Sequence, residues 1–240
     1  MKAINPATGE LIREYAEPTP AAAAEIVNQV HEAHLAWRKT PFSHRSSLMN
    51  KAAAILRERK GEYGRLMARE MGKPVAQGEA ETEKCGWVCD YYAEKAEEFL
   101  ADEPIETDAT KSFIAHQPLG VVLAVMPWNF PFWQVFRFAA PALMAGNGGL
   151  LKHASNVPGC ALAIEQVFRD AGFPEHIFRT LLIGGRGVAA VIEHPHVVAV
   201  TLTGSTPAGQ AVASTAGRVL KKSVLELGGS GKLILKFRTG

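Results

Sequence analysis

Apolar residues recur every three or four positions through most of the first hundred residues, as they do on the buried faces of helices. Four helices are expected, from Pro20, from about Ser43, over 62–71 and over 75–100. The first has Thr19 as its expected N-cap, and the third stops at Gly72-Lys73-Pro74, a C-terminal glycine followed by a proline. Ahead of them, the turn Ala7-Thr8-Gly9-Glu10 predicts a small hairpin.

From residue 112 onward, short apolar runs alternate with helical stretches. One strand is expected over 112–116, and five more over 121–126, 149–152, 179–183, 197–203 and 223–227. Helices are expected between those five, over 132–145, 157–171, 186–194 and 206–216. This alternation indicates an α/β fold with a parallel, doubly wound (Rossmann-like) sheet. The chain then divides into a mostly helical part with the hairpin, 1–111, an α/β core, 112–229, and a tail, 230–240.

Composition narrows the function classes. The net charge is +2 and no basic face is apparent, so neither a nucleic-acid nor a membrane partner is expected. No apolar run approaches the ~20 residues of a membrane crossing and no signal core is seen, so we expect a cytoplasmic location. Cys85, Cys89 and Cys160 are too few for a disulfide framework. No histidine stands near the first two, so we expect core packing and no metal site.

The apolar run 121–126, expected to be a strand buried on both faces, leads into Pro127-Trp128-Asn129-Phe130-Pro131. The two prolines should hold Asn129 on a bend at the carboxyl end of a central strand, where open α/β sheets bind ligands. A side-chain amide held there can donate a hydrogen bond to an oxygen that becomes negative during a reaction. For this stretch alone, an ordinary strand-to-helix turn is the alternative.

Three further features follow strands of the same sheet. Lys152 and Ser155 suit the hydroxyl groups of a ribose, although most lysines after a strand are merely solvated. Thr203-Gly204-Ser205 ends a strand and opens a helix whose free N–H groups suit a pyrophosphate, with a capped helix and no ligand as the alternative. Glu226 is flanked by leucines in an apolar strand, where its pKa should rise and suit a general base.

The ordered set of these motifs resembles the aldehyde dehydrogenase superfamily. The matching segments are 4–10, 70–74, 127–131, 141–147, 203–205 and 225–229. Each is weak alone, but they are colinear over nearly the whole chain, which makes the set specific. Through the run from Pro127 to Arg137, the sequence is most similar to bacterial succinate-semialdehyde dehydrogenases.

The resemblance implies oxidation of an aldehyde, here succinate semialdehyde, with NAD or NADP as the cofactor. It also implies that 112–229 is the dinucleotide-binding core and that 1–111 is the helical part of the same cofactor domain. Asn129 would stabilise the oxyanion of a thiohemiacetal, Glu226 would activate the water that hydrolyses the thioester, and Arg137 would bind the substrate carboxylate. Cofactor contacts are implied at Pro127, Trp128, Lys152, Ser155, Gly204, Ser205 and Leu227. A complete enzyme is expected to be a homo-oligomer.

One part of the family pattern is missing. Members use a cysteine nucleophile well beyond the glutamate, whereas this sequence ends fourteen residues after Glu226 and Cys160 lies elsewhere. The tail 230–240 also departs from the family pattern. We therefore expect the chain as given to be inactive on aldehydes. The alternative is a catalytically silent dinucleotide-binding module. A CoA-acylating dehydrogenase is disfavoured, because transfer to CoA needs no water-activating base.

Overall fold

Five parallel strands form the central sheet of the structure, a computed structural model that describes residues 1–228. Across the sheet they lie in the order β7 (Phe178–Thr180), β6 (Gly148–His153), β5 (Val121–Met126), β8 (Val197–Gly204) and β9 (Lys222–Leu227). The chain winds outward from β5 to one edge and then from β8 to the other. The winding reverses between β5 and β8, and a crevice opens at the carboxyl ends of these two strands. The predicted doubly wound sheet is confirmed.

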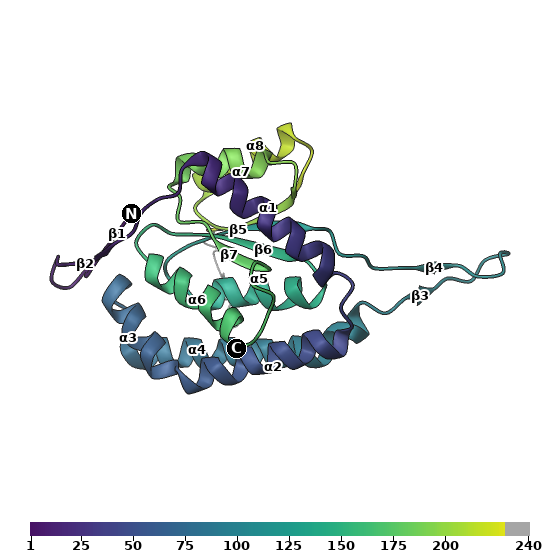
Figure 1. Cartoon of the computed structure of the whole chain (residues 1–240), viewed down its shortest axis with the longest axis horizontal. Coiled ribbons are helices and arrows are strands. Elements are labelled where there is room, and N and C mark those ends of the chain that lie inside the picture. Colours follow the sequence, from purple (N-terminus) through teal and green to yellow (C-terminus); the bar gives the residue numbers. More distant parts are fainter. Residues whose placement is uncertain (229–240) are drawn as a thin grey trace, which may run out of the picture.

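Helices cover the sheet in layers (Figure 1). On one face lie α1 (Pro20–Trp37), α7 (Val188–Glu193) and α8 (Thr206–Arg218), and on the other α5 (Trp133–Met144) and α6 (Pro158–Asp170). A further layer outside α5 and α6 holds α2 (Phe42–Glu58), α3 (Lys60–Met71) and α4 (Val75–Phe99). A 3₁₀ turn, Gly185–Gly187, leads into α7. None of the helices within residues 1–228 is long and apolar enough to cross a membrane.

Helix boundaries follow the predicted stop and start signals. The hydroxyl of Thr19 accepts a hydrogen bond from the Ala22 N–H at 3.2 Å and caps α1. Gly72 ends α3 in the left-handed conformation, with φ of 76°, which glycine adopts without strain. The start of α1 and the end of α3 are therefore set by local chemistry.

One apolar core joins the outer helices to the sheet. Side chains of α2 and α4 pack against those of α5 and α6, which in turn cover β5 and β6. Cys85, Cys89 and Cys160 are fully buried in this core, as predicted. A second cluster on the opposite face packs Val27 and Val30 of α1 against the sheet. The helical part and the sheet thus share their interior, and a domain boundary at 111/112 stays a prediction.

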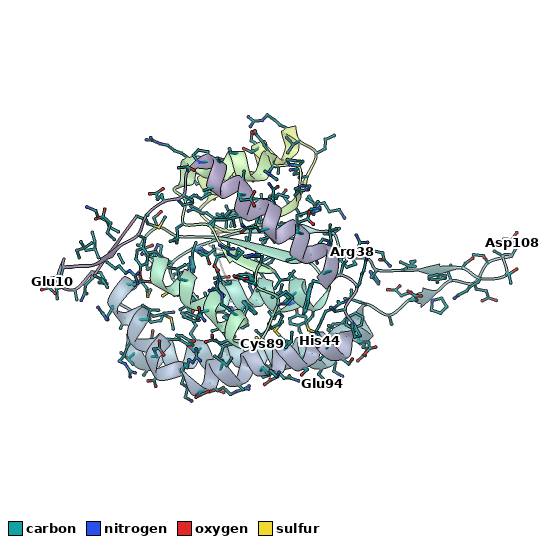
Figure 2. The ribbon with its side chains drawn as sticks, viewed as in Figure 1. Glu10, Arg38, His44, Cys89, Glu94 and Asp108 are labelled. Carbon is teal, nitrogen blue, oxygen red and sulfur yellow. The ribbon has the colours of Figure 1, made fainter. Side chains whose placement is uncertain are left out.

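Two hairpins extend away from this body. The predicted one pairs β1 (Lys2–Ile4) with β2 (Leu11–Glu14), with Glu10 near its tip (Figure 2). The other carries Asp108 near its tip at the opposite end of the molecule (Figure 2).

That second hairpin corrects the strand expected over 112–116. Only β4 (Phe113–Ile114) forms, and it pairs antiparallel with β3 (Glu103–Pro104), outside the parallel sheet. The segment around it is too rich in polar residues to be buried, and both β4 side chains are exposed.

The strand expected over 179–183 is also shorter than predicted. It ends at Thr180, because the N–H of Ile183 turns back to donate to the Leu181 carbonyl at 2.8 Å.

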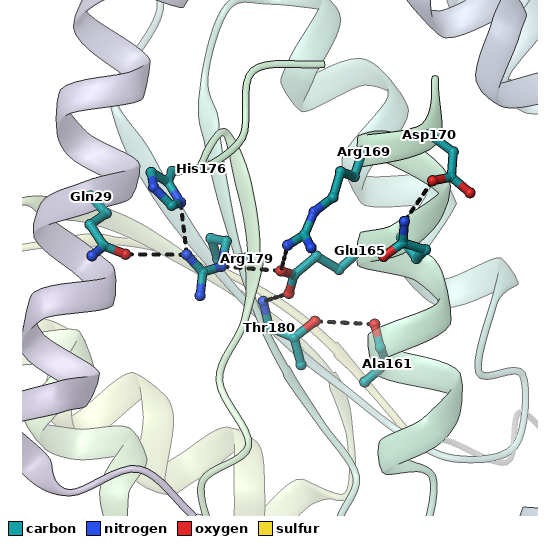
Figure 3. A network of polar contacts seen from close by, with 9 residues as sticks. Gln29, Ala161, Glu165, Arg169, Asp170, His176, Arg179 and Thr180 are labelled. Carbon is teal, nitrogen blue, oxygen red and sulfur yellow. Dashed lines mark hydrogen bonds and ion pairs between the residues drawn. The ribbon is translucent and has the colours of Figure 1, made fainter. Parts of the chain in front are cut away.

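A buried polar network holds this short edge strand in place (Figure 3). The carboxylate of Glu165 on α6 accepts the N–H of Thr180 at 2.7 Å and forms ion pairs with Arg169 and Arg179, each at 3.1 Å. Arg179 also donates to Gln29 of α1 at 3.2 Å. The network therefore ties β7 to helices on both faces of the sheet.

Candidate cofactor and active site

The turn after β5 opens onto a pocket at the switch point of the sheet. Pro127 follows β5 directly, and Trp128 and Asn129 are exposed in the turn. The pocket has a volume of about 430 Å³ and is lined by Pro127, Trp128, Asn129, Thr203, Gly204, Ser205, Glu226, Leu227 and Gly228. Three strand ends, those of β5, β8 and β9, therefore bring together every predicted site residue except Arg137, Lys152 and Ser155. Gly229, the last residue of the 225–229 motif, lies outside the described residues.

Gly204 borders open space in this pocket. A Cβ atom built there would come no closer than 3.6 Å to another part of the chain, the side chain of Leu202. Its backbone φ is not positive, so neither packing nor backbone geometry within the described residues requires glycine. The absence of a side chain instead leaves room for a ligand to approach the backbone.

The start of α8 offers fewer free donors than predicted. Ser205 caps the helix, its hydroxyl accepting from Ala208 N–H at 3.5 Å, and Pro207 has no N–H to donate. The amide of Thr206 is still among the first-turn groups that a helix leaves without an internal partner. An anion here would be held by Thr206 N–H and the Ser205 hydroxyl.

Lys152 lies in a second, largely apolar pocket of about 320 Å³. The lining residues are Val125, Lys152, Gly185, Val188, Ala189, Ile192, Leu202, Ala208, Ala211, Val212 and Thr215. Burial lowers the pKa of Lys152, and its ammonium has no hydrogen-bond or ion-pair partner within residues 1–228. Ser155 lies exposed in the loop three residues further on. A half-buried cation without a partner suits an anionic or hydroxyl-rich ligand group.

Glu226 corrects the expectation of an apolar setting. Its side chain is 47% exposed, because β9 is an edge strand of the sheet and most of its residues are exposed. The carboxylate accepts from the guanidinium of Arg137 and from the hydroxyl of Thr203, the latter at 3.3 Å. Glu226 is therefore an accessible, ion-paired carboxylate.

Glu226 also joins two pockets. A third pocket, of about 400 Å³, is lined by Arg137, Gln134, Thr203 and Glu226 together with apolar residues of α5. The same carboxylate borders the pocket that contains Asn129. The two residues assigned to catalysis and the one assigned to substrate therefore face connected space.

The three cysteines do not contribute to this site. Burial raises the pKa of the thiols of Cys85, Cys89 and Cys160. None of them lines the pocket of Asn129. In the part of the chain that the structure describes, no group of three or more His, Cys, Asp or Glu side chains is placed to hold a metal ion.

The sequence as a whole matches the model of the aldehyde dehydrogenase family over residues 1–237. The chain belongs to the aldehyde dehydrogenase family. This agrees with the ordered motifs and with the site at the ends of β5, β8 and β9.

Similar proteins show which members of the family the chain resembles. The chain is 55% identical over 232 residues to a probable succinate-semialdehyde dehydrogenase [NADP(+)] of Synechocystis sp., covering 97% of this chain and 51% of that protein. It is 50% identical over 235 residues to the succinate-semialdehyde dehydrogenase [NADP(+)] of Mycobacterium leprae, with the same coverage. A crystal structure of succinic semialdehyde dehydrogenase from Streptococcus pyogenes with NADP+ superposes with a TM-score of 0.92 at 38% identity, covering 95% of this chain and 50% of that one. The chain spans about half the length of the curated relatives it matches.

Sequence reasoning missed the apolar pocket of this aldehyde dehydrogenase chain. Its walls are the facing sides of α7 and α8, which carry small residues such as Ala189, Ala208 and Ala211. Small side chains at helical spacing on two successive helices were the available signal. They leave space between the helices that larger side chains would fill.

Proposed function

We propose that this chain forms the dinucleotide-binding part of an NADP-dependent succinate-semialdehyde dehydrogenase. The observation that carries the proposal is the convergence of Asn129, Gly204, Ser205 and Glu226 on one pocket at the switch point of the sheet. A lone capped helix or a lone turn would not collect an amide, a backbone approach and a carboxylate at one place. The names and cofactors of the similar proteins support the choice of substrate and cofactor.

The described residues fit a dinucleotide in three places. The open space at Gly204, next to Ser205 and Thr206, suits the pyrophosphate. The apolar pocket between α7 and α8 has the size and lining for a flat base. Lys152 borders that pocket with its ammonium unpartnered among the described residues, which suits a ribose carrying a 2′-phosphate. Ser155 adds a hydroxyl without a competing charge, and Pro127, Trp128 and Leu227 border the space for the nicotinamide end.

NADP+, when bound, would supply the acceptor for the hydride that leaves the aldehyde carbon. Asn129 donates its side-chain N–H to the oxygen on that carbon and stabilises negative charge there. Glu226 accepts a proton from the water that completes conversion to the acid. Arg137 binds the far carboxylate of the substrate and orients it. Because Cys85, Cys89 and Cys160 are all buried, none of them suits the role of the family's nucleophilic cysteine, and a complete enzyme would need another cysteine.

The other expectations stay predictions. Assembly of the complete enzyme as a homo-oligomer and its cytoplasmic location rest on the family resemblance and on the sequence. A silent dinucleotide-binding module is the second candidate, and the burial of all three cysteines of this sequence favours it for the 240-residue chain.

Steady-state kinetics of a chain extended to the relatives' full length tests the proposal. Succinate semialdehyde with NADP+ is expected to give a higher kcat/KM than butanal, an uncharged aldehyde of similar length. Equal values for the two aldehydes would contradict the substrate, and NADPH formation with neither would contradict the reaction class.

A further inference from the structure

Two buried carboxylates link the outer helical layer to the two loops of the proposed site. Glu70 lies on α3 and Glu81 on α4, and both residues are at most 5% exposed. The side-chain oxygens of each accept two backbone N–H groups from the first turn of a different helix on the sheet. Neither contact takes part in the proposed chemistry, and Glu70 belongs to the motif 70–74 that the site leaves unexplained.

Glu81 holds the start of α5. Its Oε1 accepts the N–H of Phe132 at 2.9 Å and that of Trp133 at 3.0 Å. Asn129 precedes Phe132 by three residues, in the same turn. The N-cap position of α5 is Phe132 itself, which supplies no side-chain cap. The cap that a local Ser, Thr, Asp or Asn usually provides therefore comes from another helix.

Lys73 completes this contact. Its ammonium forms an ion pair with Glu81, and both side chains are almost fully buried. The same ammonium lies 3.9 Å from the centroid of the Phe130 ring, the residue next to Asn129. Buried ion pairs are often no more stabilising than well-packed apolar side chains. A buried pair here is better explained by the geometry it imposes on the turn than by stability.

Glu70 holds the start of α6 in the same way. Its two oxygens accept the N–H groups of Gly159 at 2.8 Å and Cys160 at 2.9 Å. The N-cap residue of α6, Val157, supplies no side-chain cap. A Cβ atom at Gly159 would lie 2.6 Å from Glu70 Oε1, so the close approach requires glycine there. Ser155 lies in the loop that this contact ends.

We infer that Glu81, with Lys73, is a positioning residue for Asn129, and that Glu70 is a positioning residue for the loop of Ser155, which links Lys152 in β6 to α6. This inference rests on the proposed function. The helical layer thus fixes the oxyanion donor and the ribose loop separately, one carboxylate to each. Removing the Glu81 carboxylate should therefore lower kcat and leave NADP+ binding unchanged, and removing the Glu70 carboxylate should weaken NADP+ binding and leave kcat unchanged.

The test compares Glu81→Ala with Glu70→Ala in the chain extended to the relatives' length. Glu81→Ala is expected to lower kcat by about 10- to 100-fold, because a misplaced oxyanion donor loses most of its effect, and to leave the Kd for NADP+ within about twofold. Glu70→Ala is expected to raise the Kd for NADP+ by about tenfold and to change kcat at saturating cofactor little. Equal effects of the two variants on both constants would overturn the inference.

Two further variants separate positioning from general damage to the fold. Arg45→Gln removes the guanidinium that donates to the Met144 carbonyl at the opposite end of α5. It should lower stability without changing either constant. The double variant Lys73→Met/Glu81→Gln keeps an oxygen acceptor and removes the buried charges, so it should restore kcat to within a few-fold of wild type. Loss of kcat in Arg45→Gln, or no recovery in the double variant, would overturn the positioning role.

Amide hydrogen exchange on the 240-residue chain decides the inference independently of activity. Glu81→Ala should speed exchange at Phe132 and Trp133 but not at Gly159 and Cys160, and Glu70→Ala should do the reverse. If the wild-type enzyme oxidises no aldehyde, the proposed function fails. The exchange pattern still tests whether Glu81 and Glu70 hold the starts of α5 and α6. Unchanged exchange at both pairs of amides would overturn the inference whatever the activity.

Discussion

The guanidinium of Arg137 forms an ion pair with the carboxylate of Glu226, between the pocket that holds Asn129 and the pocket that holds Arg137. Both side chains are more than a third exposed, so the pair adds little to stability. The residue proposed for the substrate carboxylate is thus already bound to the proposed base. A substrate carboxylate that pairs with Arg137 would release Glu226, which couples substrate recognition to the base.

Arg137→Ala tests this coupling in the full-length enzyme. It is expected to lower kcat/KM for succinate semialdehyde by about 2–3 kcal/mol, the scale of a lost charged hydrogen bond, and to affect butanal little. Arg137→Lys, which keeps the charge without the two-pronged geometry, should fall between wild type and Ala. Parallel losses on both aldehydes would mean that Arg137 serves only Glu226.

Ser155 is expected to decide whether NADP is accepted. A carboxylate at this position, as in Ser155→Glu, would repel the 2′-phosphate that Lys152 is proposed to bind. The change should weaken NADP+ by about 1–3 kcal/mol and leave NAD+ nearly unchanged, as measured by the Kd of each cofactor. Equal weakening of the two would show that residue 155 does not face the ribose.

His153 should make stability depend on pH. Burial lowers the pKa of His153 to about 4. Its Nε2 donates a hydrogen bond to the Pro131 carbonyl at 2.9 Å, and its Nδ1 accepts one from the Ala154 N–H at 2.9 Å. Because the folded pKa lies below the unfolded value of about 6.5, the folded state is fully stable above that pH and loses stability as the pH falls towards 4.

The loss from His153 alone is at most about 3 kcal/mol. Burial also lowers the pKa of His31, His34 and His194, which act in the same direction. Urea unfolding between pH 4.5 and 7.5 should show a smaller pH slope for His153→Gln than for wild type. Identical slopes would show that His153 is not held neutral.

The cysteines give a prediction for the chain as given. All three thiols are buried with raised pKa, so none can act as a ready thiolate. The 240-residue chain should form no NADPH from succinate semialdehyde, and a thiol reagent should label it only after unfolding. Turnover that Cys160→Ala abolishes would refute both this prediction and the assignment of the site.

Local signals were enough to predict most of the fold. β5 has the predicted limits, because Gly120 and Pro127 punctuate both of its ends. The strand expected over 112–116 is longer than β4, since a polar segment with a two-residue strand has too little pattern to set the strand's limits.

Features that depend on residues far apart in the sequence could not be predicted in the same way. The exposure of Glu226 depends on β9 being an edge strand, which is a property of the sheet order. Its pairing with Arg137 spans 89 positions, and the contact of Glu81 with Phe132 spans 51. Candidate site residues can therefore be proposed from local motifs, whereas their partners depend on the packed fold.

Calorimetric titration of the 240-residue chain with NADP+ tests the central claim most directly. The account predicts saturable binding at one site. It also predicts that Gly204→Ala weakens this binding by about tenfold or more, since a methyl group enters the space proposed for the pyrophosphate. Gly217→Ala, at the far end of α8 with open space around it, should bind as wild type does. No binding at about 1 mM NADP+, or equal affinities for the wild type and Gly204→Ala, would contradict the account.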